Sequence, residues 1–386
     1  MSIGTRIYAE LRGDRAIWAI IVLLAMFSIL AVYSSTGTLA YKRAGGNTEF
    51  FLLKHFVILM GGLLLTYLCY MMHYTRYKQV APYLMFIAVP LLFYTIVMGA
   101  DINDARRWIE VPFVGITFQT SDFAKIALIT LVAREITKHK DYIKEFQNAF
   151  LPIIVPVLII CGLIAPADLS TAMLLFFTCM LMMFIGRVST QYIGLLFLLG
   201  IVVFAGLIVL AEFLPDGSDI VRVETWVKRV QDFIEQPEGG YQVQLSKIAI
   251  ANGDIFGMGP GNSIQRNFLP SPYSDFIYSI ICEEYGIFGG FIIIGLYVFL
   301  FFRTTRLVTK SSKSFGAMLA VGLSLILVLQ AMANIAVAVH LVPVTGLTLP
   351  MISMGGTSLL FTSVALGMIL SVSKYIETVD ITETDE

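Results

Sequence analysis

Charged side chains are scarce in this chain of 386 residues, and that scarcity excludes most classes of soluble protein. Asp, Glu, Lys and Arg make up 14% of the residues, while apolar and aromatic residues make up 57%. Soluble domains carry about 25% charged residues. The formal net charge of −1 also argues against a nucleic-acid partner, which requires a strongly basic surface. The composition therefore predicts an integral membrane protein.

Cysteine and histidine are rare as well, with four of each. All four cysteines fall in apolar segments, and their spacing is not that of metal ligands: Cys69, Cys161, Cys179 and Cys282. We interpret them as small buried residues. No metal site is expected from the sequence pattern.

Long apolar runs dominate the chain, and a membrane-crossing helix needs about 20 such residues. Arg6, Arg12 and Arg15 precede a first run of full length, so no cleavable signal peptide is expected. The fourth and fifth runs are interrupted by charges and prolines. The expected spans are 17–35, 50–72, 80–99, 119–136, 150–165, 171–187, 190–211, 274–302, 315–340 and 350–373. These runs predict an all-α polytopic membrane protein with about ten transmembrane helices.

Basic residues are distributed unequally between the two sides that these spans define. With the N-terminus inside, the short outer loops carry only Lys42, Arg43, Arg106 and Arg107. The inner segments carry Arg6, Arg12, Arg15, Arg76, Lys78, Arg134, Lys138, Lys140, Lys144, Arg187, Arg303, Arg306, Lys310, Lys313 and Lys374. Because positive charge favours the cytoplasmic side, we expect a cytoplasmic segment 1–16, one transmembrane domain 17–373 and an acidic cytoplasmic tail 374–386.

The one long outer loop, 212–273 between the seventh and eighth spans, contains an amphipathic pattern. Apolar residues recur at helical spacing: Val223, Trp226, Val227, Val230, Phe233 and Ile234. This pattern predicts a helix in the membrane interface, which is either a plain surface helix or a lid over a lipid substrate. The glycines at 257, 259 and 261 do not form a nucleotide fingerprint, since no strand precedes them.

Carboxylates accompany the apolar run that follows this loop. Asp275 lies at the junction, and Glu283 and Glu284 lie inside the run. Each charge placed in a membrane costs about 2.5–3.5 kcal/mol on insertion scales. We therefore expect a site that handles protons or cationic groups. Asp275 can also be interpreted as a plain residue of a helix start.

A second polar group lies within residues 105–128. Arg106 and Arg107 stand beside Trp108, and Asp122 and Lys125 share one face of the next helix. In one interpretation Trp108 anchors the interface, Asp122 helps to cap the helix and Lys125 extends toward water. In the other, the arginines and the lysine form a pocket for phosphate or pyrophosphate.

Two further segments carry weaker signals. Asp168, Ser170 and Thr171 have the pattern of a helix cap. Residues 334–360 combine prolines with paired glycines, which predicts broken or re-entrant backbone buried in protein or lining a cavity. His340 lies in this segment, and we interpret it as a packed residue outside the site.

Taken in order, these motifs resemble the SEDS family (shape, elongation, division and sporulation). The resemblance covers roughly residues 106–367 and is carried by ARRWI at 105, by Gln119, Ser121, Asp122 and Lys125, by Asp168 and Thr171, by GMGPGNSIQR at 257, by SDFIYSIICEEYG at 274 and by PVTGLTLPMISMGGTS at 343. The GPGNSIQR and YQVQLSKIAIANGD runs are more similar to the division branch than to the elongation branch. The chain departs from the family at Thr120 and Asp122 (usually Pro and Glu), Ser271 (usually Glu) and Ser274 (usually Thr).

The resemblance implies an enzyme that polymerises lipid II into peptidoglycan glycan strands. Asp275 matches the family's catalytic aspartate, which would serve as the general base. Arg106, Arg107, Lys247 and Arg266 become candidates for holding the pyrophosphate. Glu283 and Glu284, about 12–13 Å deeper along a regular helix, would organise the cavity floor through Lys125. The substrate-binding set is completed by Trp108 and Gln265.

The resemblance also implies partners and a location. These are a class B penicillin-binding protein and other cell-division proteins, at the division septum of a bacterial cytoplasmic membrane. A divalent cation, Mg²⁺ or Mn²⁺, is a further implied participant. Two other functions stay open on the residues alone: a lipid II transporter, and a non-catalytic scaffold for cell-wall synthesis.

Overall fold

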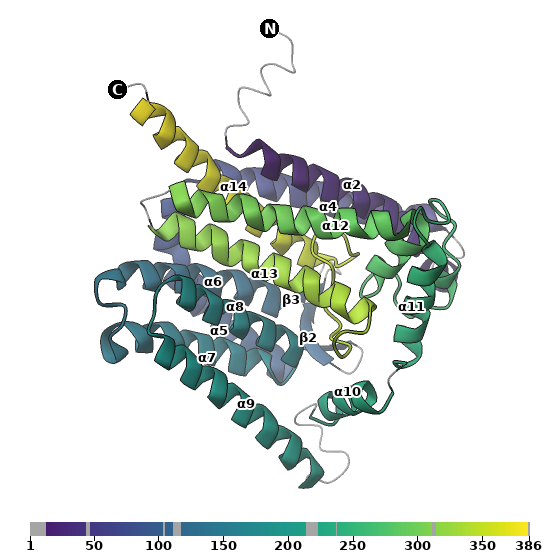
Figure 1. Cartoon of the computed structure of the whole chain (residues 1–386), viewed down its shortest axis with the longest axis horizontal. Helices are drawn as coiled ribbons and strands as arrows, with labels where there is room; N and C mark the ends of the chain where they lie inside the picture. Colours follow the sequence, from purple (N-terminus) through teal and green to yellow (C-terminus); the bar gives the residue numbers. More distant parts are fainter. Residues whose placement is uncertain are drawn as a thin grey trace.

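A bundle of long helices makes up most of the computed structural model, which describes residues 13–43, 47–102, 105–110, 117–213, 223–236, 238–310 and 314–384 (Figure 1). Within these residues, each of the ten expected spans corresponds to a helix. They are α2 (Arg15–Ser35), α4 (Thr48–Met71), α5 (Tyr74–Met98), α6 (Thr120–Lys138), α7 (Leu151–Ile164), α8 (Leu169–Ile185), α9 (Thr190–Phe213), α12 (Ile277–Lys310), α13 (Ser314–Ala338) and α14 (Thr357–Thr384). A short helix, α3 (Gly37–Arg43), follows α2.

Seven described helices are long and apolar enough to cross a membrane. They are α2, α4, α5, α12, α13, α14, and α7 together with the π-helical turn Phe146–Phe150. Helix α8 is apolar but shorter, as is the apolar part of α9. Helix α6 carries Asp122 and Lys125 and is buried along most of its length. The protein is therefore a helical polytopic membrane protein, with its most polar long helix inside the bundle.

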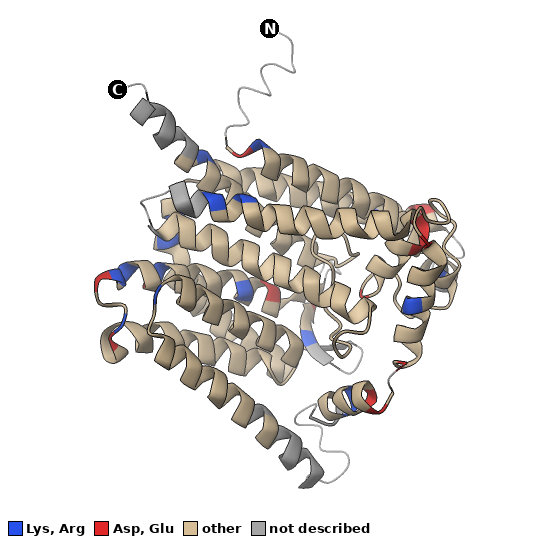
Figure 2. Ribbon diagram, viewed as in Figure 1, with Lys and Arg blue, Asp and Glu red and all other residues tan. Residues whose placement is uncertain are grey.

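The two ends of the bundle differ in what they bring together. At one end, which we call the terminal end, Asp14 caps α2 and forms an ion pair with Arg303 of α12 at 2.6 Å. Ser373 of α14 accepts a hydrogen bond there from the Asp14 backbone at 3.1 Å. The opposite, loop end carries the sheet and the helices of the long loop (Figure 1). Lys and Arg gather mostly at the terminal end (Figure 2). The unequal distribution of basic residues along the sequence therefore corresponds to two ends of the bundle that differ in charge.

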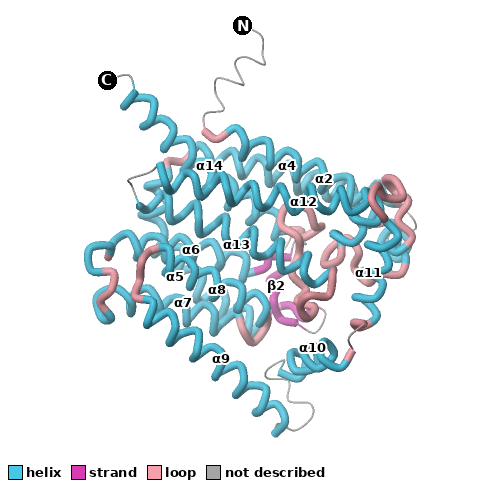
Figure 3. The backbone as a smooth tube through the Cα atoms, in the orientation of Figure 1, coloured by secondary structure: helices cyan, strands magenta, loops and turns pink. Residues whose placement is uncertain are grey.

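A small antiparallel sheet, which the sequence analysis did not predict, lies between α5 and α6 (Figure 3). Its strands are β1 (Ala100–Ile102), β2 (Ala105–Glu110) and β3 (Thr117–Gln119), in that order. Trp108 pairs with Gln119 across β2 and β3. Thr357, the first residue of α14, donates a hydrogen bond to the Thr117 carbonyl at 3.0 Å. The sheet therefore ties α6 to the start of α14.

The long loop contains two helices. The expected amphipathic helix is confirmed as α10 (Val223–Glu235), while residues 214–222 lie outside the described part. A second helix, α11 (Tyr241–Gly253), was not predicted. It packs on the start of α12, where Ser246 lies 2.5 Å from the Ser279 hydroxyl and donates to the Ala338 carbonyl at 2.6 Å. This stretch therefore forms part of the packed structure.

Helix α12 is not the regular helix that the sequence suggested, because it breaks at Gly286. This residue has φ 71° and ψ −177°, a backbone conformation open to glycine alone. The chain from Asp254 to Gly259 packs against the break, with Met258 donating to the Glu283 carbonyl and Ile287 to the Asp254 carbonyl, both at 2.9 Å. A Cβ on Gly257 or Gly286 would overlap a backbone atom of the facing segment. These glycines therefore serve close backbone contact.

The last expected span, 350–373, begins later than predicted. Residues 341–356 contain no helix, and α14 starts at Thr357. The expected broken backbone is confirmed, and its part at 347–353 is mostly buried in protein. Gln330 of α13 donates to the Thr348 carbonyl at 2.9 Å, and Met354 donates to the Tyr273 carbonyl at 2.9 Å. This segment packs against the residues just before α12.

Candidate functional site

Asp275 lies in the turn just before α12, and its backbone is held by two other segments. Asn334 of α13 donates to the Asp275 carbonyl at 2.8 Å and to the Leu347 carbonyl at 2.7 Å. Ser353 donates to the Ser274 carbonyl at 2.7 Å. Because the turn before α12, helix α13 and the segment between α13 and α14 meet here, the position of the Asp275 backbone is fixed by tertiary structure.

The carboxyl group of Asp275 is partly buried and accepts one hydrogen bond from the described side chains. Its Oδ1 accepts a hydrogen bond from Ser274 at 2.8 Å, and its Oδ2 faces Gly346. Burial raises the pKa of Asp275 above its ordinary value, and this effect outweighs the opposing hydrogen bond from Ser274 and the charges of Arg229 and Arg107. A carboxyl with a raised pKa is better suited to accept a proton than an ordinary surface aspartate.

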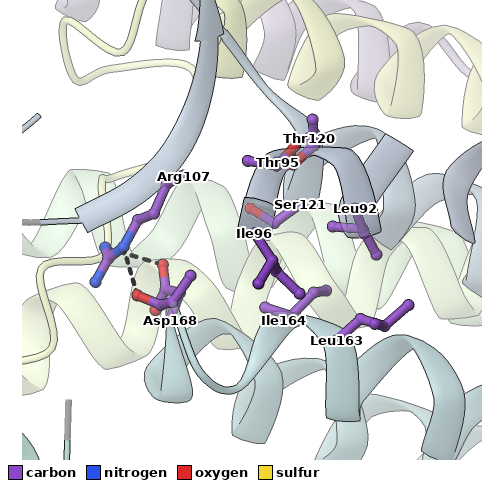
Figure 4. A pocket seen from close by; sticks show the side chains of 10 residues that line it. Leu92, Thr95, Ile96, Arg107, Thr120, Ser121, Leu163, Ile164 and Asp168 are labelled. Carbon is purple, nitrogen blue, oxygen red and sulfur yellow. Dashed lines mark hydrogen bonds and ion pairs between the residues drawn. The ribbon is translucent and has the colours of Figure 1, made fainter. Parts of the chain in front are cut away.

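Arg107 and Asp168 form an ion pair (Figure 4), and the charges of both act on the carboxyl of Asp275. Arg107, in β2, lies 3.1 Å from Asp168 Oδ2 through Nη1 and donates to the Ala167 carbonyl at 2.7 Å. Asp168 also caps α8 by accepting from the Thr171 backbone at 3.0 Å, which confirms the expected cap. The adjoining cavity of about 20 Å³ has room for roughly one water molecule. A diphosphate must therefore displace Asp168 or enlarge this space in order to bind Arg107 here.

The neighbours of Arg107 in β2 are placed less fully. Arg106 precedes it in the strand, paired with Asp101, and its side chain lies outside the described part of the structure. Trp108 is partly buried in the sheet opposite Gln119. The interpretation of Arg106 and Trp108 as substrate-binding residues stays a prediction.

Asp122 and Lys125 form the expected ion pair on α6, at 2.7 Å. Lys125 also donates to Gln330 at 3.2 Å, and both members of the pair are mostly buried. Lys125 therefore does not extend toward water, and it does not join Glu283 and Glu284. Asp122 Oδ2 has no hydrogen-bond partner among the described residues. It lines a cavity of about 30 Å³, which can hold one or two waters.

Glu283 and Glu284 are fully buried and bind the chain at 263–265. Glu283 accepts hydrogen bonds from the Ser263 hydroxyl and from the backbone of Gln265 at 3.2 Å. Glu284 accepts from the Ser34 hydroxyl and from the backbone of Ser263 at 3.4 Å. These hydrogen bonds offset the cost of burying two carboxylates. Both carboxylates therefore hold the loop at 263–265.

The expected depth of these glutamates is also wrong. Ser34 is the penultimate residue of α2, and Asp14, at the other end of that helix, is the residue bound to Arg303. Glu284 therefore lies toward the loop end. Helix α12 breaks at Gly286, just after this pair, and its part after the break continues to Arg303, which binds Asp14.

The remaining predicted residues contact the protein itself. Lys247 of α11 donates to the Glu238 carbonyl at 2.8 Å. Arg266 donates to the carbonyl and hydroxyl of Ser34, each at 3.0 Å. Gln265 has a buried Oε1 with no partner in the described part of the chain. Arg229 of α10 was missed by the sequence analysis, although its place on the polar face of an amphipathic helix was a usable signal.

The part of the chain that the structure describes holds no cluster of three metal-ligating side chains (His, Cys, Asp or Glu) at this site. Asp168, the carboxylate that acts on Asp275, is bound to Arg107. No step proposed below passes through a divalent cation.

Comparison with known proteins places the whole chain. Residues 14–378 match the model of the cell cycle protein family that comprises FtsW, RodA and SpoVE. The chain is 32% identical to a "Probable peptidoglycan glycosyltransferase FtsW" of Trichlorobacter lovleyi over 96% of each chain. It is also 32% identical to stage V sporulation protein E of Bacillus subtilis, over 94% of this chain and 97% of the other.

Solved structures agree with these relatives in fold. A chain of a peptidoglycan synthase complex, described as coordinating polymerization and crosslinking, superposes with a TM-score of 0.75 at 23% identity, over 94% of this chain and 98% of that one. The rod shape determining protein RodA of Thermus thermophilus superposes with a TM-score of 0.63 at 22% identity, over 94% and 96%. The chain described here therefore belongs to the FtsW, RodA and SpoVE family of cell cycle proteins.

Proposed function

We propose that this protein is a peptidoglycan glycosyltransferase that polymerises lipid II into β-1,4-linked glycan strands, with Asp275 as the general base. The observation that carries the proposal is a partly buried carboxyl of raised pKa at one end of the bundle, facing the charges of Arg107 and Arg229. Relatives that share about a third of the sequence over nearly the full chain bear the name peptidoglycan glycosyltransferase.

The reaction needs one base and one cationic group. Lipid II carries its disaccharide in the α configuration on a pyrophosphate, and the polymer bond is β, so a single displacement inverts the anomeric carbon. The 4-hydroxyl of the acceptor sugar forms the new bond and gives its proton to Asp275. The bond between the anomeric carbon and the pyrophosphate oxygen breaks, and its electron pair leaves with the pyrophosphate. Positive charge placed at that oxygen stabilises the transition state.

Arg107 is the residue best placed to supply that charge. Its guanidinium fork matches the geometry of a phosphate oxygen pair. Asp168 now accepts one of its N–H groups, so the pyrophosphate would take the place of Asp168 or bind beside it. In this proposal Asp168 holds Arg107 in position while the site is empty. Arg106 adds charge from the same strand.

Sidedness follows from charge. Because Lys and Arg gather mostly at the terminal end, that end faces the cytoplasm and the loop end faces outward. Lipid II would then be used at the outer face of the cytoplasmic membrane. We further propose a role in cell division at the septum, alongside other cell-division proteins, with a class B penicillin-binding protein as the partner that crosslinks the strands. The similarity to a chain of a peptidoglycan synthase complex supports such a partnership.

One assay tests the proposal. Purified protein, with and without the partner, is incubated with lipid II, and the products are separated by length. The wild type should make strands, and Asp275→Asn should bind lipid II without making them. Asp254→Asn is the matched control, because Asp254 is exposed and the change keeps the size of its side chain. Strands of normal length from Asp275→Asn would favour a transporter or a scaffold instead.

A further inference from the structure

A groove near Asp275 takes no part in the proposed displacement reaction. It lies at the loop end between α10, the start of α11 and the turn after α13, and it has a volume of about 400 Å³. Ligand pockets commonly measure about 300–1,000 Å³. Its lining includes Arg229, Asp232, Phe233, Tyr241, Gln242 and His340.

The lining side chains suit a carbohydrate. Phe233 and Tyr241 are aromatic, and a sugar ring packs its apolar CH face against such rings. Arg229 donates hydrogen bonds, Asp232 accepts them, and Gln242 does both, as hydroxyl groups require. A lipid chain would make no use of the hydrogen-bonding groups of the lining, and a free phosphate would be repelled by Asp232. The mixture of aromatic and hydrogen-bonding groups therefore points to sugar hydroxyls and sugar faces.

The groove is held in shape by strained and tightly packed backbone. His340 has φ 60°, in the left-handed region that residues other than glycine seldom adopt. Such strain persists where surrounding structure enforces it and is common at ligand sites. The His340 ring packs edge-on against Phe233 with centroids 5.0 Å apart, and Gly239, with φ 84°, lies close to the same ring. His340 thus joins α10 to the turn after α13.

The groove also adjoins Asp275. Val344 lines the groove, and two residues later Gly346 lies against the Asp275 carboxyl. Arg229 lines the groove and acts electrostatically on Asp275. The groove therefore lies close to the reaction centre from which a chain of sugars would leave.

We propose that this groove binds sugar units of the glycan strand and keeps the strand on the protein between successive additions. The inference rests on the proposed function, because it assigns the groove to the product of that reaction. It adds Tyr241, Gln242 and His340 as residues that determine strand length without contacting the reacting atoms.

Binding can be measured without catalysis. The chain has three tryptophans, and Trp226 in α10 lies one turn from Arg229 and two turns from Phe233 along the helix. In a Trp18→Phe, Trp108→Phe background, fluorescence then reports on α10 alone. Titration with soluble, lipid-free β-1,4-linked N-acetylglucosamine–N-acetylmuramic acid oligomers should give a saturable change, also in Asp275→Asn. Gln242→Ala and His340→Ala should weaken it about tenfold, and Lys228→Ala, on the exposed face, should not.

Strand length is the second readout. Gln242→Ala, at an exposed position where loss of folding is not expected, should consume lipid II at the wild-type initial rate but release strands several-fold shorter. Unchanged strand length in this variant, or no binding of oligomers by the parent protein, overturns the proposal that the groove binds the glycan strand. The two proposals fail separately. If the protein makes strands but does not bind oligomers, only the groove proposal fails. If it binds oligomers but makes no strands, only the polymerase proposal fails.

Discussion

Asp275 and the pair Glu283–Glu284 belong to the same short stretch of sequence, yet the structure gives them opposite surroundings. The two glutamates are saturated by hydroxyl and amide donors from residues 263–265 and from Ser34. Asp275 accepts one side-chain hydrogen bond, from Ser274, and faces arginines of two other segments. A buried carboxylate whose oxygens all accept hydrogen bonds is structural. A carboxylate with fewer donors, close to cationic side chains, can accept a proton during a reaction.

The largest expected effect distinguishes Asp275 from the two glutamates. Asp275→Asn keeps the size of the side chain but removes the base, and a positioned base contributes about 10²–10⁴ in rate. We expect polymerisation of lipid II to fall by that range while the unfolding temperature in detergent stays unchanged. Asp275→Glu should retain a little activity, because the carboxylate is displaced by one methylene group. A near-normal rate for Asp275→Asn contradicts the assignment.

Next in size is the loss of the cation facing Asp275. Arg107→Ala removes both the charge offered to pyrophosphate and the ion pair with Asp168, and we expect the use of lipid II to fall by roughly 10–100-fold, since removal of one stabilising group at a transition state costs up to about 10²–10³. Initial rates at several lipid II concentrations measure this.

Two lysines calibrate the Arg107 result. Lys247→Ala should act much more weakly, because its ammonium group is bound to the Glu238 carbonyl. Lys42→Ala should also act weakly, because Lys42 belongs to the short helix α3, which carries none of the motifs. Equal small effects from all three would support the interpretation of the arginines as interfacial anchors.

The glutamates should show the reverse of the Asp275 pattern. Glu283→Ala leaves the Gln265 amide and the Ser263 hydroxyl without their acceptor, and each hydrogen bond to a charged group contributes about 1.5–3 kcal/mol. The unfolding temperature should fall by several degrees, and activity should fall only in proportion to the folded fraction. Glu283→Gln should recover part of the loss. A stable but inactive Glu283→Ala protein would give this residue a role in the reaction.

The smallest effect is a shift of the pH profile. The base must be deprotonated, so activity should rise with pH through the raised pKa of Asp275. The Arg229 cation lowers this pKa and the Asp168 charge raises it. The acid limb should therefore move to higher pH in Arg229→Gln and to lower pH in Asp168→Asn, each by a fraction of a unit. Rates measured from pH 4 to 8 decide, and movement in the same direction for both variants would mean that Asp275 is not the titrating group.

Much of the fold could be predicted because the membrane imposes a strong one-dimensional pattern. Runs such as those of α2, α4 and α13 leave little choice but to cross a bilayer as helices. Helix α10 could be predicted for a similar reason, since apolar residues at helical spacing mark an interfacial helix. The β1–β3 sheet was missed because its strands are only three to six residues long, too short for a periodic signal.

The sequence by itself determined the membrane class, the helix order, the two unequal ends and the importance of Asp275, which rested on local patterns and on a resemblance carried by long motifs. Only the tertiary structure decided the rest. It paired Arg107 of β2 with Asp168 at the start of α8, assigned Glu283 to a loop instead of a substrate, and brought the charge of Arg229 to act on Asp275. The surroundings of each carboxylate depend on which donors lie within hydrogen-bond distance of it. Those donors come from segments far apart in the chain, so only the packed structure brings them together.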